Sequence, residues 1–405
     1  MGGVSMEWKL KDLTVDGKGS YGIGAPAVPY QEDKLTYLRI TDINDDGSLN
    51  FSDLKSVDAE DAEKYILKEN DIVFARTGNS TGRSYFYEKQ HGTFVYAGFL
   101  IKFSLDPHKV NPIIMKYYTH SKPYFDWVNS FDTGATRGNI NAKTYGDMEI
   151  ELPSRKVQDN IVSILSSLDR KIELNNKINA DLEEMAQAIF KNWFVDFEPF
   201  KDGKFVESEL GMIPEGWKVG RLTEIASYMN GLAMQKYPPE NNEDSLPVLK
   251  IKELGQGFCG TDSDRCSCNI KDECKIHNGD VIFSWSGTLL VDVWCGGDCG
   301  LNQHLFKVTS NDYPKWFYYY WTKHHLQEFI HIAKDKAVTM GHIKRGHLEK
   351  ALVAIPDNDS MKKAHELFDP ILSKMISLRL ETSRLSALRD TLLPKLMSGE
   401  LEVSE

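Results

Sequence analysis

The chain repeats itself at an offset of about 200 residues, and this duplication constrains its fold more than any other feature. "DIVFARTG", which starts at Asp71, returns as "DVIFSWSG", which starts at Asp280, a shift of 280 − 71 = 209. "EWKLKDL" around Trp8 returns as "GWKVGRL" around Trp217, again a shift of 217 − 8 = 209. Two matches at one offset indicate a tandem duplication.

Two further segments return in the same order. "TYLRITDI" returns as "PVLKIKEL", and Leu38 matches Leu249 at a shift of 249 − 38 = 211. "TRGNINAKTYGDMEIELP" returns as "TMGHIKRGHLEKALVAIP", and Gly138 matches Gly341 at a shift of 341 − 138 = 203. The sequence therefore predicts two units of one fold.

Each unit begins with a mixed α/β (α+β) part and ends in a long helix. Short strand-like runs such as "YLRI" and "DIVFA" are separated by turns rich in Gly, Asn and Asp, with short helical pieces between them. Leu, Ala, Glu, Lys and Met dominate the stretches that follow, from about 156 to 194 and from about 360 to 397. We expect globular domains over residues 1–153 and 201–356, and conserved long helices within 154–200 and 357–405.

Both long helices carry an apolar seam with the spacing of a coiled coil. Leucine, isoleucine and methionine alternate at intervals of three and four residues, as heptads require. Asn175 and Asn179 fall on the seam of the first helix; there they would specify the register, unless they face solvent instead. The seam residues are Ile161, Leu165, Leu168, Ile172, Leu182 and Ile189 in the first helix, and Ile371, Met375, Leu378, Leu385, Leu392 and Leu396 in the second.

The length of these helices favours pairing with each other. A helix of about 36 residues is roughly 54 Å long, which exceeds the radius of a domain of this size. Packing onto the adjacent globular domain, the usual role of an apolar stripe, would therefore leave much of each helix uncovered. We expect an antiparallel coiled coil with one globular domain at each end and approximate twofold symmetry.

Familiar catalytic patterns are missing from the sequence. It contains no G-x-x-x-x-G-K-[ST] phosphate loop, no G-x-S-x-G nucleophile elbow and no H-E-x-x-H zinc helix. The six cysteines lie between Cys259 and Cys299 without paired C-x-x-C knuckles, so we expect thiols, with structural zinc as the alternative. The chain is predicted to be a non-enzyme that itself needs no cofactor.

The turns next to the repeated strands are rich in side chains that bind DNA. Arg, Lys, Asn and Gln can read base edges, and Ser and Thr reach phosphates; the alternative is that these are simply polar turns. The matched turns differ in sequence while their strand frames agree, which is typical of one scaffold with two specificities. The candidates are Arg76, Thr77, Asn79, Thr81, Arg83, Arg137, Asn139, Asn141 and Lys143 in the first unit, and Trp285, Ser286, Thr288, Gln303, His304, Lys334, Lys336, Thr339, His342 and Lys344 in the second.

The net charge opposes this interpretation when the chain is taken alone. The formal charge is −11 at pH 7, whereas DNA binding draws much of its affinity from neutralised phosphates. We therefore expect weak unaided binding to DNA.

Several stretches of the chain resemble a known family. "SILSSLDRKIELNNKINADLEEMAQAIFKNWFVDFEPF", followed by "ESELGMIPEGWKVGRL", is similar to the central region of type I restriction–modification specificity subunits. "LRDTLLPKLMSGEL" resembles their distal conserved region, and "FSWSG" with "LNQHLFKV" resembles a target-recognition domain. The resemblance covers essentially the whole chain.

This resemblance implies a function and a set of partners. The two globular parts would be target-recognition domains that each read one half of a bipartite sequence in double-stranded DNA. The helices would set the spacer and dock two methyltransferase subunits that carry S-adenosylmethionine, and motor–nuclease subunits would join them. No apolar run suited to a membrane span and no signal peptide is evident, so a cytoplasmic location is expected.

Two other classes of function stay open at this stage. The chain could be a coiled-coil adaptor that docks partners without reading DNA. It could also be the recognition half of a split enzyme with different chemistry, which only the motifs of its partner would identify.

Overall fold

The chain folds into two compact units that each contain parts of both long helices. The computed structural model describes residues 6–131, 138–240, 244–335 and 341–403. One unit comprises residues 1–170 and 386–405, and the other comprises residues 171–385. The division therefore runs through the long helices, whereas the boundaries predicted from the sequence follow the ends of the globular segments.

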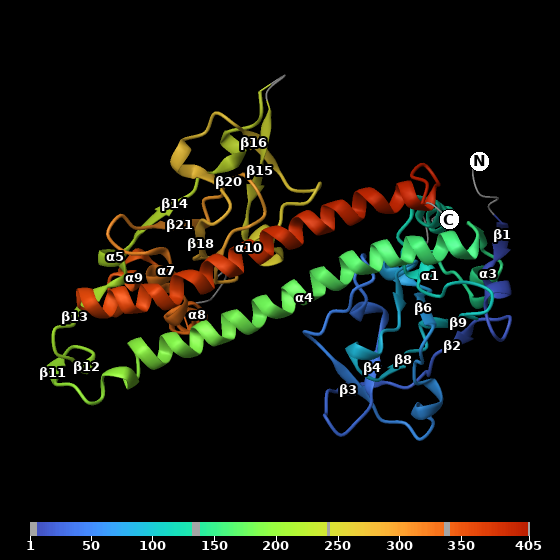
Figure 1. Cartoon of the computed structure of the whole chain (residues 1–405), viewed down its shortest axis with the longest axis horizontal. Helices are drawn as coiled ribbons and strands as arrows, with labels where there is room; N and C mark the ends of the chain where they lie inside the picture. Colours follow the sequence, from blue (N-terminus) through green and yellow to red (C-terminus); the bar gives the residue numbers. More distant parts are fainter. Residues whose placement is uncertain (1–5, 132–137, 241–243, 336–340, 404–405) are drawn as a thin grey trace. The chain divides into compact units, whose positions relative to one another are not determined.

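The first unit contains two four-stranded sheets (Figure 1). One has the order β2-β9-β6-β7 and is antiparallel. The other has the order β3-β5-β4-β8, in which β4 and β8 run parallel. The strands are β1 (Met6–Lys9), β2 (Ser20–Tyr21), β3 (Ala27–Pro29), β4 (Thr36–Leu38), β5 (Lys55–Val57), β6 (Asp71–Ala75), β7 (Ser84–Phe86), β8 (Phe94–Tyr96), β9 (Leu100–Ser104) and β10 (Glu149–Leu152), and the short helices are α1 (Ile114–Tyr118), α2 (Lys122–Asn129) and α3 (Ala142–Gly146).

The second unit repeats this plan. The sheet β14-β21-β18-β19 matches the antiparallel sheet, and β15 runs parallel to β20 as β4 does to β8. The strands are β11 (Phe205–Ser208), β12 (Gly211–Pro214), β13 (Lys218–Arg221), β14 (Ser227–Asn230), β15 (Ser245–Leu249), β16 (Arg265–Ser267), β17 (Lys275–Ile276), β18 (Val281–Ser284), β19 (Leu290–Val293), β20 (Cys299–Leu301), β21 (Leu305–Thr309) and β22 (Leu352–Ile355), and the short helices are α5 (Leu222–Ile225), α6 (Ile251–Gln256), α7 (Lys315–His324), α8 (Leu326–Asp335) and α9 (Arg345–Leu348). The predicted duplication is confirmed.

The aspartate that opens the repeated strand has a structural role in both units. Asp71 Oδ2 accepts a hydrogen bond from the backbone N–H of Lys68 at 2.8 Å, and Asp280 Oδ2 accepts one from the N–H of His277 at 2.9 Å. A lysine of the neighbouring strand pairs with each carboxylate, Lys102 at 3.4 Å and Lys307 at 2.8 Å. The aspartate of the repeated Asp-x-x-Phe therefore anchors the start of the strand. The turn with the predicted contact residues follows the other end of the strand.

A glycine is required at one equivalent position in each unit. A Cβ atom on Gly22 would lie 2.2 Å from the carbonyl oxygen of Tyr96, and one on Gly231 would lie 2.2 Å from that of Leu301. Real Cβ atoms do not approach backbone that closely, so only glycine lets this segment lie against the turn after β8 or β20. The offset is 231 − 22 = 209, as for the aspartates.

In the sequence Trp8 aligns with Trp217, but the residue at the structurally equivalent position lies three residues later in the chain. Trp8 lies opposite Ile150 in the β1–β10 pair, and the residue opposite Val353, which corresponds to Ile150, is Gly220. The structural shift is therefore 220 − 8 = 212, and the predicted pairing of Trp8 with Trp217 is wrong. Trp217 instead packs in the core against the rings of Phe194, Phe197 and Phe200.

The long helices are α4 (Arg155–Phe194) and α10 (Asn358–Met397), and they pack antiparallel in each unit. In the second unit Asn175 Nδ2 donates to Glu381 Oε2 at 2.9 Å, whereas Phe190, farther along α4, meets Phe368, earlier in α10. In the first unit Arg389 Nη1 lies 3.2 Å from Asp169 Oδ1.

The predicted seam faces the partner helix or the core. Ile161, Leu165, Ile371, Met375, Leu378 and Leu396 are buried, and Leu168, Ile172, Leu182, Ile189, Leu385 and Leu392 are half-buried. The predicted antiparallel pair is therefore confirmed. α10 is continuous through Pro370, a residue type that commonly interrupts helices.

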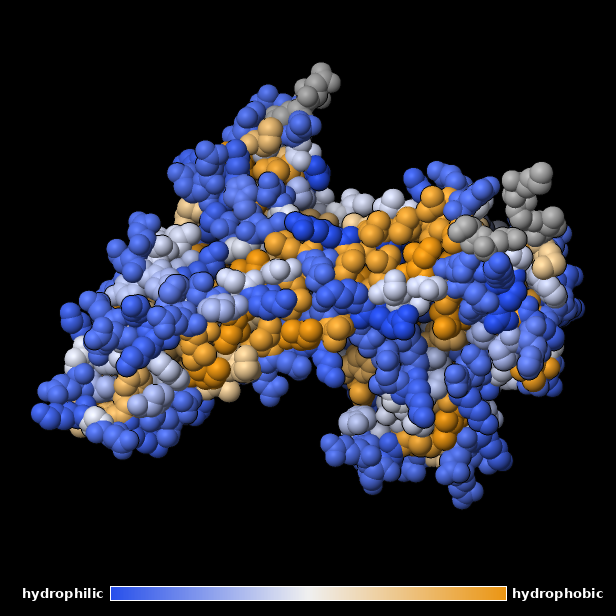
Figure 2. Space-filling view, in the orientation of Figure 1, coloured by the Kyte–Doolittle hydropathy of each residue, from blue (hydrophilic) through white to orange (hydrophobic). Residues whose placement is uncertain are grey.

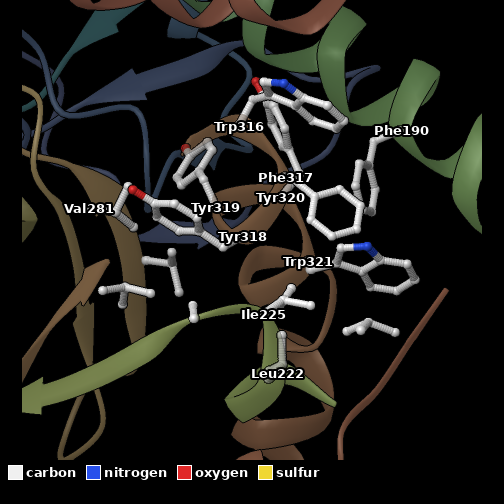
Figure 3. Close-up of a cluster of buried hydrophobic side chains, with 14 of the residues drawn as sticks. Phe190, Leu222, Ile225, Val281, Trp316, Phe317, Tyr318, Tyr319, Tyr320 and Trp321 are labelled. Carbon is white, nitrogen blue, oxygen red and sulfur yellow. The ribbon is translucent and has the colours of Figure 1, made fainter. Parts of the chain in front are cut away.

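The core of the second unit is built around one aromatic helix. Seven consecutive residues of α7, Trp316 to Thr322, are buried. Figure 3 shows the rings of Trp316, Phe317 and Tyr320 between the sheet and Phe190 of α4. The described residues include no helix that is both long and apolar enough to cross a membrane.

Candidate nucleic-acid interface

Three turns meet at the far end of β6 in the first unit. The N–H of Ile140 donates to the carbonyl of Arg76 at 3.0 Å, and the N–H of Arg76 donates to that of Phe99 at 3.1 Å. Thr81 Oγ1 donates to the carbonyl of Gly138 at 2.9 Å. The turn after β6, the turn between β8 and β9, and the segment before α3 therefore form one surface.

The second unit brings together the equivalent three turns. The N–H of Ile343 donates to the carbonyl of Trp285 at 3.1 Å, and the N–H of Trp285 donates to that of His304 at 3.4 Å. The N–H of Gly287 donates to the carbonyl of Gly341 at 3.0 Å. Arg76 and Trp285 are thus equivalent, at a shift of 285 − 76 = 209, and they carry unlike side chains on like backbones.

Some predicted contact residues of the first unit are held by the protein itself. Arg83 Nε lies 2.6 Å from Asp45 Oδ1, and its Nη1 donates to the carbonyl of Ile43 at 3.0 Å. Asn141 Oδ1 caps α3 by accepting from the N–H of Thr144 at 2.9 Å. These side chains, together with that of Thr81, bond to other groups of the protein and so stabilise the conformation of the turns.

Other predicted residues of the first unit are available to a ligand. Asn79, Asn139 and Lys143 are exposed, and Thr77 is half-buried. The guanidinium of Arg76 lies 5.1 Å above the centroid of the Tyr21 ring, and its Nε is buried without a hydrogen-bond partner in the described part of the chain. Planar, hydrogen-bonding groups of this kind are suited to base edges.

Trp285 and Ser286 support the surface of the second unit. Trp285 is half-buried against the core, and its ring centroid lies 5.9 Å from that of His304 and 6.4 Å from that of His342. Ser286 is buried, and its carbonyl accepts from Ser284 Oγ at 3.2 Å. Trp285 therefore packs beside both histidines, and Ser286 lies opposite His342 in an isolated β-bridge.

The remaining predicted residues of the second unit lie at or near the surface. Gln303 is half-buried, and its Nε2 lies 3.3 Å from Nε2 of His304. The exposed residues are Thr288, His304, Lys334, His342 and Lys344. Arg137, Lys336 and Thr339, which were also predicted, lie outside the described residues.

A cavity of about 700 Å³ next to Gln303 and His304 adds basic residues that the sequence analysis missed. Lys250 pairs with Asp264, and Lys252 Nζ lies 2.6 Å from Asp262 Oδ2, a hydrogen bond that raises the pKa of Lys252. The only sequence signal for these basic residues was the pair of lysines in "VLKIKEL", a segment that the sequence analysis used only to establish the repeat. The cavity is lined by Met234, Gln235, Pro238, Val248, Lys250, Ile251, Lys252, Asp264, Arg265, Asn302, Gln303 and His304.

The cysteines of the second unit are free thiols. The described parts of the chain place no group of three or more His, Cys, Asp or Glu side chains where they could hold a metal ion. Burial raises the pKa of Cys295 to about 11, which keeps that thiol protonated. The described side chains of the two three-turn surfaces offer hydrogen-bond donors, acceptors and cations.

Comparison with known proteins identifies relatives that match most of the chain. A domain family described as "Type I restriction modification DNA specificity domain" matches residues 12–184 and again residues 214–382. The type I restriction enzyme MjaIX specificity subunit of Methanocaldococcus jannaschii is 32% identical over 305 residues, 71% of this chain and 69% of the relative. The HindI specificity subunit of Haemophilus influenzae is 21% identical over 407 residues, 84% of this chain and 88% of the relative.

A solved structure has the same fold. The crystal structure of a type I restriction–modification S subunit from M. genitalium superimposes with a TM-score of 0.57 over 99% of this chain and 97% of that chain. The sequence identity is 15%, so this likeness concerns the fold alone.

Proposed function

The chain belongs to the family of type I restriction–modification specificity (S) subunits, the non-catalytic components that recognise a DNA target with two target-recognition domains, and on this premise we propose that each of its domains reads one half of a bipartite site. The three-turn surface, built twice on one backbone frame with different side chains, carries this proposal. Equal frames give equal docking to a duplex, and unequal side chains give unequal base preferences.

In the first domain, over residues 1–153, the proposed contacts come from the turn residues that the protein leaves available. Arg76, Asn79, Asn139 and Lys143 would face the DNA. Arg83 and Asn141 would act by shaping the turns, because internal partners already hold their side chains. Arg137 stays a proposed contact on its sequence position.

In the second domain, over residues 201–356, Gln303, His304, His342 and Lys344 would meet base edges and phosphates. The cavity beside Gln303 extends this surface with Lys250, Lys252 and Arg265. Because Asp264 and Asp262 partly neutralise the two lysines, phosphate contact there would compete with internal ion pairs. This accords with weak unaided binding by a chain of charge −11.

The long helices, within 154–200 and 357–405, are the proposed docking surface for two methyltransferase subunits. Figure 2 shows apolar surface gathered over the helices. On α4, Leu174 and Met185 are 51% and 43% exposed, and they are three helical turns apart on one face. A contiguous exposed apolar patch, rather than a single apolar side chain, marks a contact surface for another protein.

The rest of the assembly follows from this function. The methyltransferase subunits would carry S-adenosylmethionine and methylate adenine, and motor–nuclease subunits would cleave unmethylated DNA. Because its substrate is cellular DNA, the complex would act in the cytoplasm.

The experiment that tests the proposed function is a methylation map. The chain is co-expressed with its partner methyltransferase, and adenine methylation is located across a genome by long-read sequencing. A bipartite motif that disappears when this chain is omitted is the expected result. Methylation that is absent, despite a stable complex and an active partner, would instead favour a coiled-coil adaptor.

A further inference from the structure

Phe99 is an exposed apolar side chain in one of the three turns that form the first candidate surface. It is 58% exposed, whereas Phe74, Phe94 and Phe103 of the same unit are buried in its core. It lies in the turn between β8 and β9, and its carbonyl accepts the hydrogen bond from Arg76 described above. The sequence analysis did not single it out.

The turn that carries Phe99 is held firmly. The N–H of Leu100 donates to the carbonyl of Ala97 at 2.8 Å, and the N–H of Gly22 donates to that of Leu100 at 3.2 Å. Gly22 packs so tightly against Tyr96 and Ala97 that no Cβ fits there. The Phe99 backbone is therefore fixed before any ligand arrives, which keeps the entropy cost of binding low.

The same turn in the second unit carries His304. Leu305 donates to Asn302 at 3.0 Å as Leu100 does to Ala97, and Gly231 donates to Leu305 at 3.1 Å as Gly22 does to Leu100. The carbonyls of Phe99 and His304 accept from the equivalent residues Arg76 and Trp285. Phe99 and His304 thus occupy one position, where one unit presents a hydrocarbon ring and the other an imidazole.

The surroundings of Phe99 are those of a base-contacting residue. Arg76 stacks over Tyr21, which is itself 43% exposed, and the exposed Asn139 lies next to Ile140, which is bonded to Arg76. Arginine and asparagine read guanine and adenine edges, and the C5-methyl of thymine is the one apolar feature of the major groove. An exposed ring on the same three-turn surface as such side chains fits that methyl group.

We propose that Phe99 is a specificity-determining residue of the first domain and makes an apolar contact with the C5-methyl of a thymine in the first half-site. His304 takes its place in the second domain, where it makes a hydrogen-bonding contact instead. This inference rests on the proposed function, because it requires that the first domain read DNA.

The test uses the full chain assembled with its partner methyltransferase and duplexes that contain the mapped motif. Each thymine of both half-sites is replaced in turn by deoxyuridine, which lacks only the methyl group, and dissociation constants are measured. Phe99→Ala is compared with Phe99→Leu, which keeps an apolar side chain. Phe51→Ala is the matched control, because Phe51 is 49% exposed in the same unit but contacts His91, beyond the opposite end of β6.

We expect Phe99→Ala to bind the motif about tenfold more weakly, the effect of losing one buried apolar contact. One deoxyuridine in the first half-site should weaken wild-type binding severalfold and leave Phe99→Ala unaffected. Phe99→Leu should retain most of the affinity, Phe51→Ala should match wild type, and deoxyuridine in the second half-site should affect wild type and Phe99→Ala equally.

Three outcomes would overturn the inference. Phe99→Ala could bind within twofold of wild type with an unchanged motif. It could lose affinity equally for all DNA sequences, which would indicate that Phe99 contacts the DNA backbone rather than a base. Phe99→Ala could also bind every deoxyuridine duplex as much more weakly than wild type as it binds the thymine duplex. A wild-type complex with a clear bipartite motif separates these failures from a failure of the proposed function, whereas a wild-type complex without sequence preference overturns both.

Discussion

At the scale of single residues, the helix pair contains a buried polar group that is only partly satisfied. Asn175 is fully buried on the seam, and its Nδ2 donates to Glu381. Its Oδ1 has no hydrogen-bond partner among the described residues, and neither do Asn179 Oδ1 and Thr382 Oγ1. A buried carbonyl without a partner costs about 1–3 kcal/mol, so these residues contribute to register rather than to stability.

We therefore predict that Asn175→Leu raises the free energy of unfolding of the chain by about 1 kcal/mol, because it replaces an unsatisfied oxygen with hydrocarbon. Chemical denaturation of the purified chain measures this. Asn176→Leu, at the exposed neighbouring position, should change stability by less than about 0.5 kcal/mol. A clear loss of stability in Asn175→Leu would show that the hydrogen bond to Glu381 outweighs the orphaned oxygen.

At the scale of elements, α4 has two faces with different tasks. One face enters the core of the second unit through Ala186, Phe190 and Phe194, and another exposes Leu174 and Met185. The buried face is explained by contacts within the chain. The exposed face has no such explanation in the described structure, and for this reason we assign it to a partner.

The double variant Leu174→Ser/Met185→Ser is predicted to weaken methyltransferase binding at least tenfold, because two apolar contacts are removed from the interface. Its unfolding midpoint should remain close to that of the wild type, because both side chains are exposed. Co-purification and calorimetric titration with the methyltransferase subunit check the binding. Glu184→Ser, which alters an exposed polar residue of the same helix, should bind normally; equal affinity in the double variant would move the docking surface elsewhere.

At the scale of the whole molecule, the two candidate surfaces belong to units that share both long helices. The units divide between Arg170 and Lys171 in α4 and between Leu385 and Ser386 in α10. If the helices set the spacer, a change in their length should alter the distance between half-sites without altering the bases that are read.

Insertion of one heptad at both points is predicted to lengthen the spacer by about three base pairs, since seven helical residues add roughly 10 Å and a base pair occupies 3.4 Å. A heptad preserves the seam, so both helices keep their packing. Methylation mapping of the assembled complex gives the motif. Changed half-site bases with an unchanged spacer would contradict the ruler role of the helices. The matched control is the same heptad inserted in α4 alone, which should disrupt pairing and abolish methylation.

Much of the fold was predictable because its signals are local or repeated. Heptads specify long helices, and matched strands specify a duplication. The candidate surface was predictable only by region. The sequence located the turns that contain Arg76 and Trp285, but it did not distinguish Asn139, which faces solvent, from Arg83, which is bound to Asp45. Such partners lie far apart in the chain, so no local pattern reveals them.

The sequence by itself determined that this protein has two copies of one fold, two long paired helices and polar turns beside the repeated strands, because periodicity and self-similarity are properties of the chain. Only the tertiary structure decided which turn residues are free. It showed Trp285 as a support for His304 and His342, and it placed Phe99 at the surface where a phenylalanine would ordinarily be assigned to the core. The physical reason is that exposure depends on how distant segments pack, and a residue type specifies only its preference.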